Sequence, residues 1–477
     1  MNKSIILHII GWILTFEAAF MILPSIVALI YQEQSGYAFL ITAGLCLLIG
    51  LPLIIKKPKS KLFFAKEGFL SVALGWIVLS IFGSLPFYIS REIPSYIDAL
   101  FEIVSGFTTT GSSILGDVEA LSYSMLFWRS FSHWIGGMGV LVFILAILPL
   151  AGGENIYFMR AESPGYSVEK LVPRIRSSSK MLYSIYIGMT LLMIILLLLG
   201  KTPLFDALTL SFGTAGTGGF AIKNTGLADY TYYQQSVITI FMFLFGVNFN
   251  FYYLLLFGKF KSAFKMEEVR WYFIVFSLAV ILISINTGNV KGLFSAIHHS
   301  AFQVSSIMTT TGYATLDFNR WPTFSKTILV LLMFIGACGG STGGGIKVSR
   351  IIILFKSIGK ELSYLLHRRS IKVLKFEGKK IVHETMRSIN IFFVTYLFIF
   401  AGSLLIVSLD NFDFTSTFTA IAATLNNIGP GLEIVGPMGN FGDFSNLSKF
   451  VMIFNMLAGR LEIFPILLLL SPRTWKK

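Results

Sequence analysis

The sequence predicts an all-α polytopic membrane protein in which one helical unit is repeated four times. Of the 477 residues, 55% are hydrophobic and only 13% are charged, and the mean hydropathy is +0.75. These values are typical of a chain that crosses a membrane several times. A short polar stretch also recurs four times, each time between two apolar segments. An internal repeat of this kind sets the architecture of the whole chain.

The recurring stretch is rich in threonine and glycine and occupies residues 108–112, 215–219, 309–313 and 426–430. A bare cation inside a membrane needs oxygen ligands in place of its water shell, and backbone carbonyls of extended loops can supply them in rings. Four such loops predict one ring around one pore. Close packing of helices through small residues is the alternative, and it explains a single stretch more easily than four.

Each loop contributes three residues to the predicted selectivity filter. Glycine allows the backbone angles that turn successive carbonyls the same way, and threonine adds a hydroxyl acceptor. The fourth loop departs from the threonine pattern. The expected filter residues, with marker glycines at 111, 218, 312 and 429, are Thr109, Thr110, Gly111, Gly216, Thr217, Gly218, Thr310, Thr311, Gly312, Asn427, Ile428 and Gly429.

Each unit is predicted to hold an outer helix, a half-helix that leads into the loop, and an inner helix. A half-helix of about 12 residues cannot cross ~30 Å of hydrocarbon at ~1.5 Å per residue, so it must be re-entrant. With an opening pair at 4–31 and 36–55, this gives ten full spans and four half-spans. The predicted units are 69–90, 96–107 and 121–150; 181–200, 203–214 and 234–257; 271–285, 291–308 and 327–355; and 389–409, 412–425 and 450–470.

The corresponding domain boundaries place the two opening helices in 1–60, followed by units at 61–178, 179–265, 266–385 and 386–477. The formal net charge is +14. Lys and Arg concentrate in every second loop, which predicts that these loops and both termini are cytoplasmic and does not indicate nucleic acid as a partner. The opposite loops hold seven basic and thirteen acidic residues. The excess of acidic residues either attracts cations to the pore mouth or has no such role, because acidic residues in these loops barely affect membrane topology.

A glycine-rich run interrupts the inner helix of the third unit at about half its length. Five glycines in seven residues make a continuous helix unfavourable, at roughly 1 kcal/mol each, and irregular backbone at that depth must line a wet cavity or lie buried in protein. A phosphate-binding loop is excluded by spacing, since Ile346 separates the run from its lysine. The candidate gating residues are Gly339, Gly340, Ser341, Thr342, Gly343, Gly344 and Gly345, followed by Lys347 and Arg350.

Charged residues inside two spans are a further departure from an apolar helix. Arg460 lies ten residues into the last predicted span, or ~15 Å deep. It either projects into the pore as a barrier to cations or forms a structural ion pair with an acid other than Glu462, which lies on another helical face. Glu17 sits midway along the first helix and is expected to make a structural hydrogen bond. The hydrophilic stretch 357–387 is equally consistent with a docking surface and with a solvated loop.

These motifs resemble those of the Trk/Ktr/HKT superfamily of potassium transporters. The strings SGFTTTGSS, SFGTAGTGGFA, SSIMTTTGYAT and ATLNNIGPGLE are similar to its four pore loops, and RAESPG and GGSTGGGIKVSR also match. Over nearly its whole length the chain resembles the TrkH-type membrane subunit. The resemblance implies potassium uptake across the cytoplasmic membrane, an intramembrane gating loop at 339–345, a homodimer in membrane lipid and a cytosolic nucleotide-binding, TrkA-like regulatory subunit. It implies no bound cofactor, with potassium as the substrate.

Three alternatives remain beside this interpretation. The same filter would serve a channel or an ion-coupled carrier, and a sodium-coupled or less selective cation transporter would carry the same motifs. A polytopic membrane enzyme would need acids, bases or metal ligands that converge at one depth. The histidines are scattered and the two cysteines lie in apolar runs, so the sequence offers no such cluster: His8, His133, His298, His299, His367, His383, Cys46 and Cys338.

Overall fold

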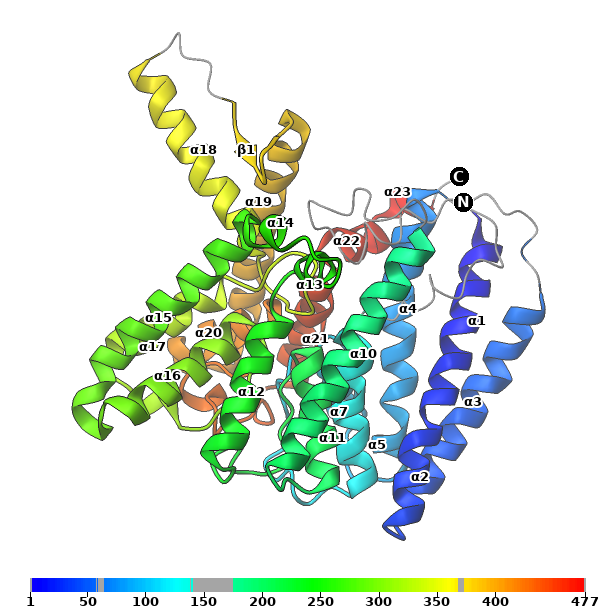
Figure 1. Ribbon diagram of the computed structural model, residues 1–477. Coiled ribbons are helices and arrows are strands. Elements are labelled where there is room, and N and C mark those ends of the chain that lie inside the picture. The colour runs from blue at the N-terminus through cyan, green and yellow to red at the C-terminus, as the bar shows by residue number, and fades with distance from the viewer. Residues whose placement is uncertain are drawn as a thin grey trace.

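The computed structural model describes residues 2–56, 58, 64–137, 139, 175–367 and 373–475 of the chain. Helices run roughly parallel through one body, and both chain ends lie at the same end of it (Figure 1). We call this the termini end. The described residues hold one small sheet, in which β1 (Lys375–Phe376) pairs antiparallel with β2 (Lys379–Lys380), with Lys375 opposite Lys380. Apart from this hairpin the described chain is helical, and the membrane architecture predicted from the sequence is confirmed.

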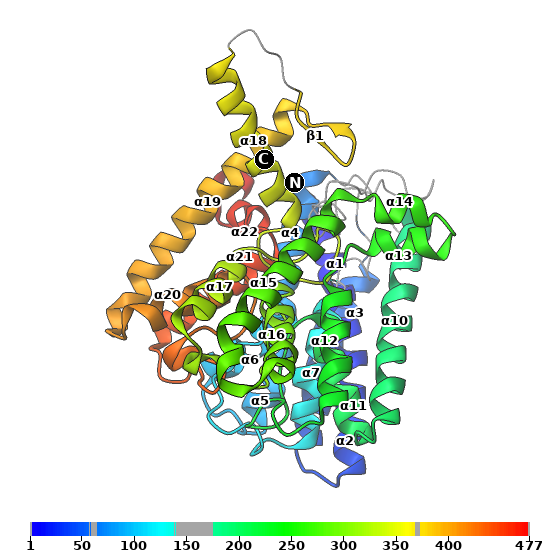
Figure 2. The same ribbon diagram turned by 60° about the vertical axis from the view of Figure 1, so that its left-hand side comes forward.

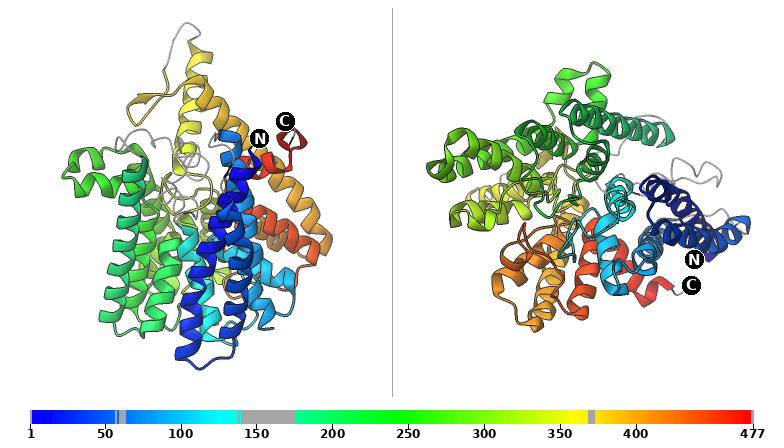
Figure 3. Two further views of the ribbon diagram at one scale, coloured as in Figure 1. Left: turned by 90° about the vertical axis from the view of Figure 1, so that its right-hand side faces the viewer. Right: turned by 90° about the horizontal axis from the view of Figure 1, so that it is seen from below.

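The opening helices pack at the edge of the body. α1 (Lys3–Phe20) and α2 (Ile22–Ile30) form one 28-residue span, and α3 (Gly36–Ile55) returns beside it (Figure 3). Leu48 of α3 is 72% exposed, as expected for a side chain that faces lipid. Glu17 lies at 1% exposure, and neither of its carboxylate oxygens has a hydrogen-bond partner among the described residues. The structural hydrogen bond expected for Glu17 is absent from this part of the chain, so the prediction was wrong.

The remaining chain forms four successive helix–short helix–helix units around a common centre (Figure 3). The first has α4 (Ala65–Gly83), α5 (Leu85–Ile89), α6 (Tyr96–Phe107) and α7 (Tyr123–Gly137). The second has α10 (Ile175–Leu199), α11 (Leu204–Gly216), α12 (Tyr232–Phe245), α13 (Phe249–Leu256) and α14 (Phe260–Phe264).

The third and fourth units follow the same order. The third has α15 (Glu267–Lys291), α16 (Leu293–Met308), η2 (Phe318–Arg320), α17 (Thr323–Met333) and α18 (Val348–Leu366). The fourth has α19 (His383–Val407), η3 (Ser408–Asp410), α20 (Phe414–Leu425), η4 (Glu433–Val435), α21 (Asn446–Arg460), α22 (Phe464–Leu470) and α23 (Pro472–Trp475).

The inner helix of the second unit is broken, which corrects the single span predicted at 234–257. α12 and α13 meet at an angle of 93°. The carbonyls of Phe245 and Gly246, at the end of α12, accept hydrogen bonds from Thr342 and Cys338 of the third unit. The Asn248 side chain accepts the amide of Asn250 and starts α13 in a new direction. Tertiary contacts therefore end this helix at half its expected length.

The last span, predicted at 450–470, is also interrupted. α21 ends at Arg460, and Glu462 and Ile463 adopt φ angles of 52° and 71°. The amide of Phe464 donates to the carbonyl of Glu462 at 2.8 Å, which makes a tight three-residue turn. Pro465 contributes to the break because it has no amide hydrogen to continue the helix.

Six described helices are long and apolar enough to cross a membrane, or seven if α12 and α13 count as one bent span. The sequence predicted ten. The difference lies in the inner helices, since in the third unit α17 ends at Met333 and α18 begins only at Val348. The expected interruption at 339–345 is therefore confirmed. Most of 138–150, predicted to complete the first inner helix, and the RAESPG motif lie outside the described residues.

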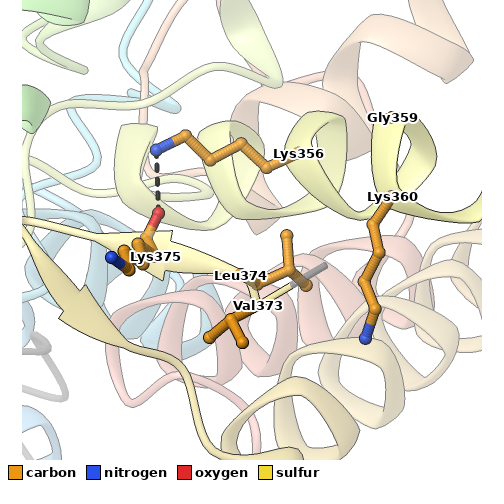
Figure 4. A pocket seen from close by; sticks show the side chains of 6 residues that line it. All are labelled: Lys356, Gly359, Lys360, Val373, Leu374 and Lys375. Carbon is orange, nitrogen blue, oxygen red and sulfur yellow. Dashed lines mark hydrogen bonds between the residues drawn. The ribbon is translucent and has the colours of Figure 1, made fainter. Parts of the chain in front are cut away.

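Helix α18 and the hairpin β1–β2 project beyond the body at the termini end (Figure 2). Lys356 of α18 donates to the carbonyl of Lys375 at 2.9 Å, at the rim of a shallow pocket also lined by Lys360 and Leu374 (Figure 4). The sequence did not decide the structure of the stretch 357–387. Part of it forms a helix and a hairpin, which are joined by the hydrogen bond from Lys356 to Lys375.

Candidate functional site: four loops and a glycine segment

Four short helices point their C-terminal ends at the centre of the body and lead into the four loops. α6 and α20 have 12 residues, α11 has 13 and α16 has 16. Three of them begin within two residues of the predicted start and the fourth, α6, at the predicted residue. Asp413 accepts hydrogen bonds from Ser416 at the start of α20, and these hold the pKa of Asp413 below its usual value. The negative ends of the helix dipoles favour a cation at the loops.

The four loops share one backbone conformation. Each has a left-handed residue followed two positions later by a left-handed glycine. The pairs are Thr109 (φ 55°) and Gly111 (81°), Thr217 (56°) and Gly219 (74°), Thr310 (60°) and Gly312 (88°), and Asn427 (57°) and Gly429 (100°). Non-glycine residues seldom adopt such angles, so their recurrence at equivalent positions identifies four copies of one structure.

This equivalence corrects the register of the second loop by one residue. The sequence assigned Gly218 as its marker glycine, but the residue with the conformation of Gly111 is Gly219. The run Gly218–Gly219 offers two glycines in succession, and the sequence pattern alone does not distinguish them. The marker glycines are therefore Gly111, Gly219, Gly312 and Gly429, and the residues before them are Thr110, Gly218, Thr311 and Ile428.

The loops close into a ring through contacts between each marker glycine and the next loop's carbonyl. A Cβ on Gly111 would overlap the carbonyl oxygen of Gly218, one on Gly219 that of Thr311, and one on Gly312 that of Ile428. A Cβ on Gly429 would lie 2.9 Å from the carbonyl oxygen of Thr110, which completes the circle. Only glycine allows this approach. The four equivalent carbonyls thus lie around a common centre.

Neutral hydrogen bonds between side chains support the first, third and fourth loops. The hydroxyls of Thr108 and Thr110 lie 2.8 Å apart, and those of Thr309 and Thr311 lie 2.7 Å apart. In the fourth loop an asparagine replaces threonine. Asn427 Nδ2 donates to the Thr110 hydroxyl at 2.9 Å and so joins the fourth loop to the first.

The glycine segment, residues 339–345, lies directly against the third and fourth loops. The amide of Gly344 donates to the hydroxyl of Thr310 at 2.6 Å. A Cβ on Gly344 would lie 2.8 Å from the carbonyl oxygen of Asn426. Gly340 and Gly345 adopt φ angles of 72° and 66°. The segment therefore sits on the termini side of the ring, since α18 leads from it to the termini end (Figure 1).

Cationic side chains hold the glycine segment by its carbonyls. Lys347 Nζ donates to the carbonyls of Gly343 and Gly344. Arg460 Nη1 donates to the carbonyl of Thr342 at 2.9 Å, and its Nη2 donates to the carbonyls of Gly136 and Gly137 at the end of α7. Arg460 thus connects α21, the segment and α7.

Among the described residues, the Arg350 side chain makes no hydrogen bond or ion pair with the segment. It pairs with Glu462 at the break between α21 and α22. Because Glu462 pairs with Arg350, it is not the ion-pair partner of Arg460. This agrees with the sequence, which places Glu462 and Arg460 on different helical faces.

Two residues that hold the loops and the glycine segment in place were not identified from the sequence. Glu268 is 4% exposed, and its Oε1 accepts the amides of Gly339 at 2.7 Å and Ser349 at 3.2 Å, so one carboxylate joins the start of the glycine segment to the start of α18. His133 lies behind the second loop, where Nε2 accepts the amide of Phe220 at 3.3 Å and Nδ1 must then donate to the carbonyl of Gly106. A glutamate in the first turn of an apolar span was the available signal for Glu268.

The comparisons with known proteins agree over the whole chain. Residues 35–477 match the family TrkH, described as a cation transport protein. The chain is 36% identical over 485 residues to the Trk system potassium uptake protein TrkH of Escherichia coli, and 35% identical over 488 residues to that of Salmonella typhimurium. Each alignment covers 100% of both proteins. The crystal structure of the potassium transporter TrkH from Vibrio parahaemolyticus superposes with a TM-score of 0.89 at 32% identity, also over 100% of both chains.

Proposed function

The chain belongs to the TrkH family of cation transport proteins, and from this premise we propose that it takes up potassium through one central pore. One observation carries the proposal. Four equivalent carbonyls, of Thr110, Gly218, Thr311 and Ile428, lie in a closed ring where only glycine fits between neighbours. Such a ring replaces the water shell of a cation without any charged ligand. The relatives named as potassium uptake proteins supply the identity of the ion.

The proposed selectivity filter consists of the four residues whose carbonyls form the ring and of the neighbouring filter residues that the sequence predicted in each loop. The side that carries the termini is proposed to face the cytoplasm, in keeping with the basic loops on that side. On this orientation, the ion passes the ring first and the glycine segment second. Arg460 lies at the level of that segment.

We propose that the glycine segment is the gate. It lies directly beneath two filter loops and is held by long cationic side chains, which can change rotamer and release its carbonyls. A chain of contacts also leads from it to the projecting end. Glu268 binds the segment, the neighbouring Glu267 pairs with Lys356, and Lys356 binds the hairpin carbonyl of Lys375.

The projecting helix α18 and hairpin are the proposed docking place for a cytosolic nucleotide-binding subunit. The names of the relatives assign them to a Trk system, which supports the presence of further components. A homodimer belongs to the same proposal.

The test is uptake by the purified protein in liposomes. With a potassium gradient as the only driving force, we expect potassium to enter and sodium to enter more slowly. A strict requirement for a sodium or proton gradient would support a coupled carrier instead. Equal rates for potassium and sodium would contradict the proposed selectivity.

A further inference from the structure

We propose that the ion pair of Glu102 and Arg129 is a positioning device that fixes two filter loops together and so contributes to the preference for potassium. The inference rests on the proposed filter. It concerns residues outside the ring, which touch neither the ion nor the proposed gate.

The pair is fully buried and joins two helices. Arg129 of α7 approaches Glu102 Oε1 of α6 with Nη2 at 2.7 Å and Nε at 2.8 Å. The side chains are 2% and 0% exposed. Burying two charges is costly unless each is paired and its remaining hydrogen-bonding groups are satisfied. The partners that complete this pair are therefore informative.

Those partners belong to the first and second loops, just beyond the ring. Glu102 accepts the hydroxyl of Ser113 at 3.0 Å and the amide of Ile114 at 3.0 Å. Arg129 Nη1 donates to the carbonyl of Ala221 at 3.3 Å, and the guanidinium lies 4.1 Å from the centre of the Phe220 ring.

Ser113 and Ala221 occupy equivalent positions, each two residues after its marker glycine, Gly111 or Gly219. The pair thus holds the same point of two neighbouring loops. A shift of either residue would change the distance between the first and second sectors of the ring.

The described units do not repeat this device. The residue seven positions before the left-handed threonine or asparagine is Glu102 in the first unit but Leu210, Gln303 and Ala420 in the others. In the third unit Gln303 Nε2 donates a long hydrogen bond of 3.5 Å to the hydroxyl of Thr315. In the fourth, the hydroxyl of Thr419 accepts the amide of Leu432 at 2.9 Å.

Neutral groups therefore serve to hold the corresponding segments of the third and fourth loops. Hydrogen bonds to a charged partner are roughly twice as strong as neutral ones. The ionic pair therefore gives the first and second loops a stronger link than neutral groups give the third and fourth.

The experiment measures potassium and sodium uptake in the same liposomes for the native protein, the double variant Glu102→Gln/Arg129→Met and the single variant Ser113→Ala. The double variant removes both charges together, so that neither is left buried alone. Ser113→Ala leaves the ion pair intact and removes the side-chain link through the Ser113 hydroxyl, while the amide of Ile114 still binds Glu102. We expect the ratio of potassium to sodium uptake to fall by roughly threefold or more in the double variant, and less in Ser113→Ala.

A second ion pair supplies the control. Asp98, four residues before Glu102 on the same helix, binds Lys449 Nζ at 2.6 Å, and its side chain has no hydrogen bond to a filter loop among the described residues. Asp98→Asn should leave the uptake ratio unchanged.

An unchanged ratio in Ser113→Ala, or in a double variant that folds, would assign the pair to folding alone and overturn the proposal. If the double variant does not fold, Ser113→Ala decides. Failure of the native protein to prefer potassium would instead refute the proposed function.

Discussion

The proposed filter and the proposed gate are both irregular backbone buried in a helical protein, yet different interactions hold them. Around the ring, glycine faces carbonyl and threonine hydroxyls bond to one another. At the glycine segment, a carboxylate holds the first amide and two cations hold carbonyls. Direct contacts between backbones leave little freedom of position, whereas the half-buried side chains of Lys347 and Arg460 can change rotamer and release the carbonyls that they bind. We infer that one region is built to keep its shape and the other to change it.

The comparison predicts that the largest loss of selectivity follows from a side chain on a marker glycine. Gly111→Ser and Gly312→Ser would each place an atom on the neighbouring carbonyl and force a left-handed backbone on serine, at a cost of about 1–3 kcal/mol. We expect the ratio of potassium to sodium permeability to fall by roughly tenfold or more.

Relative permeability by electrical recording is the measurement, with Gly402→Ser as control because nothing lies within 4 Å of a Cβ there. An unchanged ratio in both variants would remove the basis for the filter assignment.

Removal of a cation from the gate should change flux without changing ion preference. Arg460→Ala loses the hydrogen bonds to Thr342 and to the end of α7. It also removes a positive charge from the proposed pore at the depth of the glycine segment. We expect resting potassium flux to rise about fivefold, measured without any regulatory subunit. Unaltered flux together with a large drop in unfolding temperature would show that Arg460 serves the fold alone.

Weakening the hydrogen bonds of the Glu268 carboxylate should raise resting potassium flux, but by less than Arg460→Ala does. Glu268→Gln keeps the shape of the side chain but weakens its bonds to the amides of Gly339 and Ser349. Resting flux is expected to rise about threefold. Glu267→Gln is the matched control, since Glu267 binds Lys356 and the amide of Glu377 in the hairpin and makes no hydrogen bond to the segment among the described residues. Equal effects of the two changes would contradict a specific role for Glu268.

The smallest effect is expected where the fourth loop departs from threonine. Asn427→Thr restores the residue type of the other three loops but loses the bonds from Asn427 to Thr110 and to the carbonyl of Met456, both 2.9 Å. We expect the permeability ratio to fall about twofold. A ratio above that of the native protein would mean that asparagine weakens the filter, and that the link between the first and fourth loops has no part in selectivity.

The sequence by itself determined the membrane architecture, the four loops and the glycine interruption. Each of these follows from local properties. An apolar run of about 20 residues spans a membrane, a run of 12 does not, and five glycines in seven residues do not continue a helix. The first short helix, Tyr96–Phe107, has the predicted bounds for this reason.

The tertiary structure alone decided which groups meet. The choice of Gly219 over Gly218 depends on the third loop's carbonyl, which lies 92 residues further along the chain at Thr311. The break after Phe245 depends on the amides of Thr342, in the glycine segment, and of Cys338, just before it. The sequence does not distinguish Glu268 and Glu102 from other acidic residues. Only the folded chain places each of them against a backbone amide that it binds. Local composition fixes the length and depth of a helix, whereas a hydrogen bond between distant segments depends on how the helices pack.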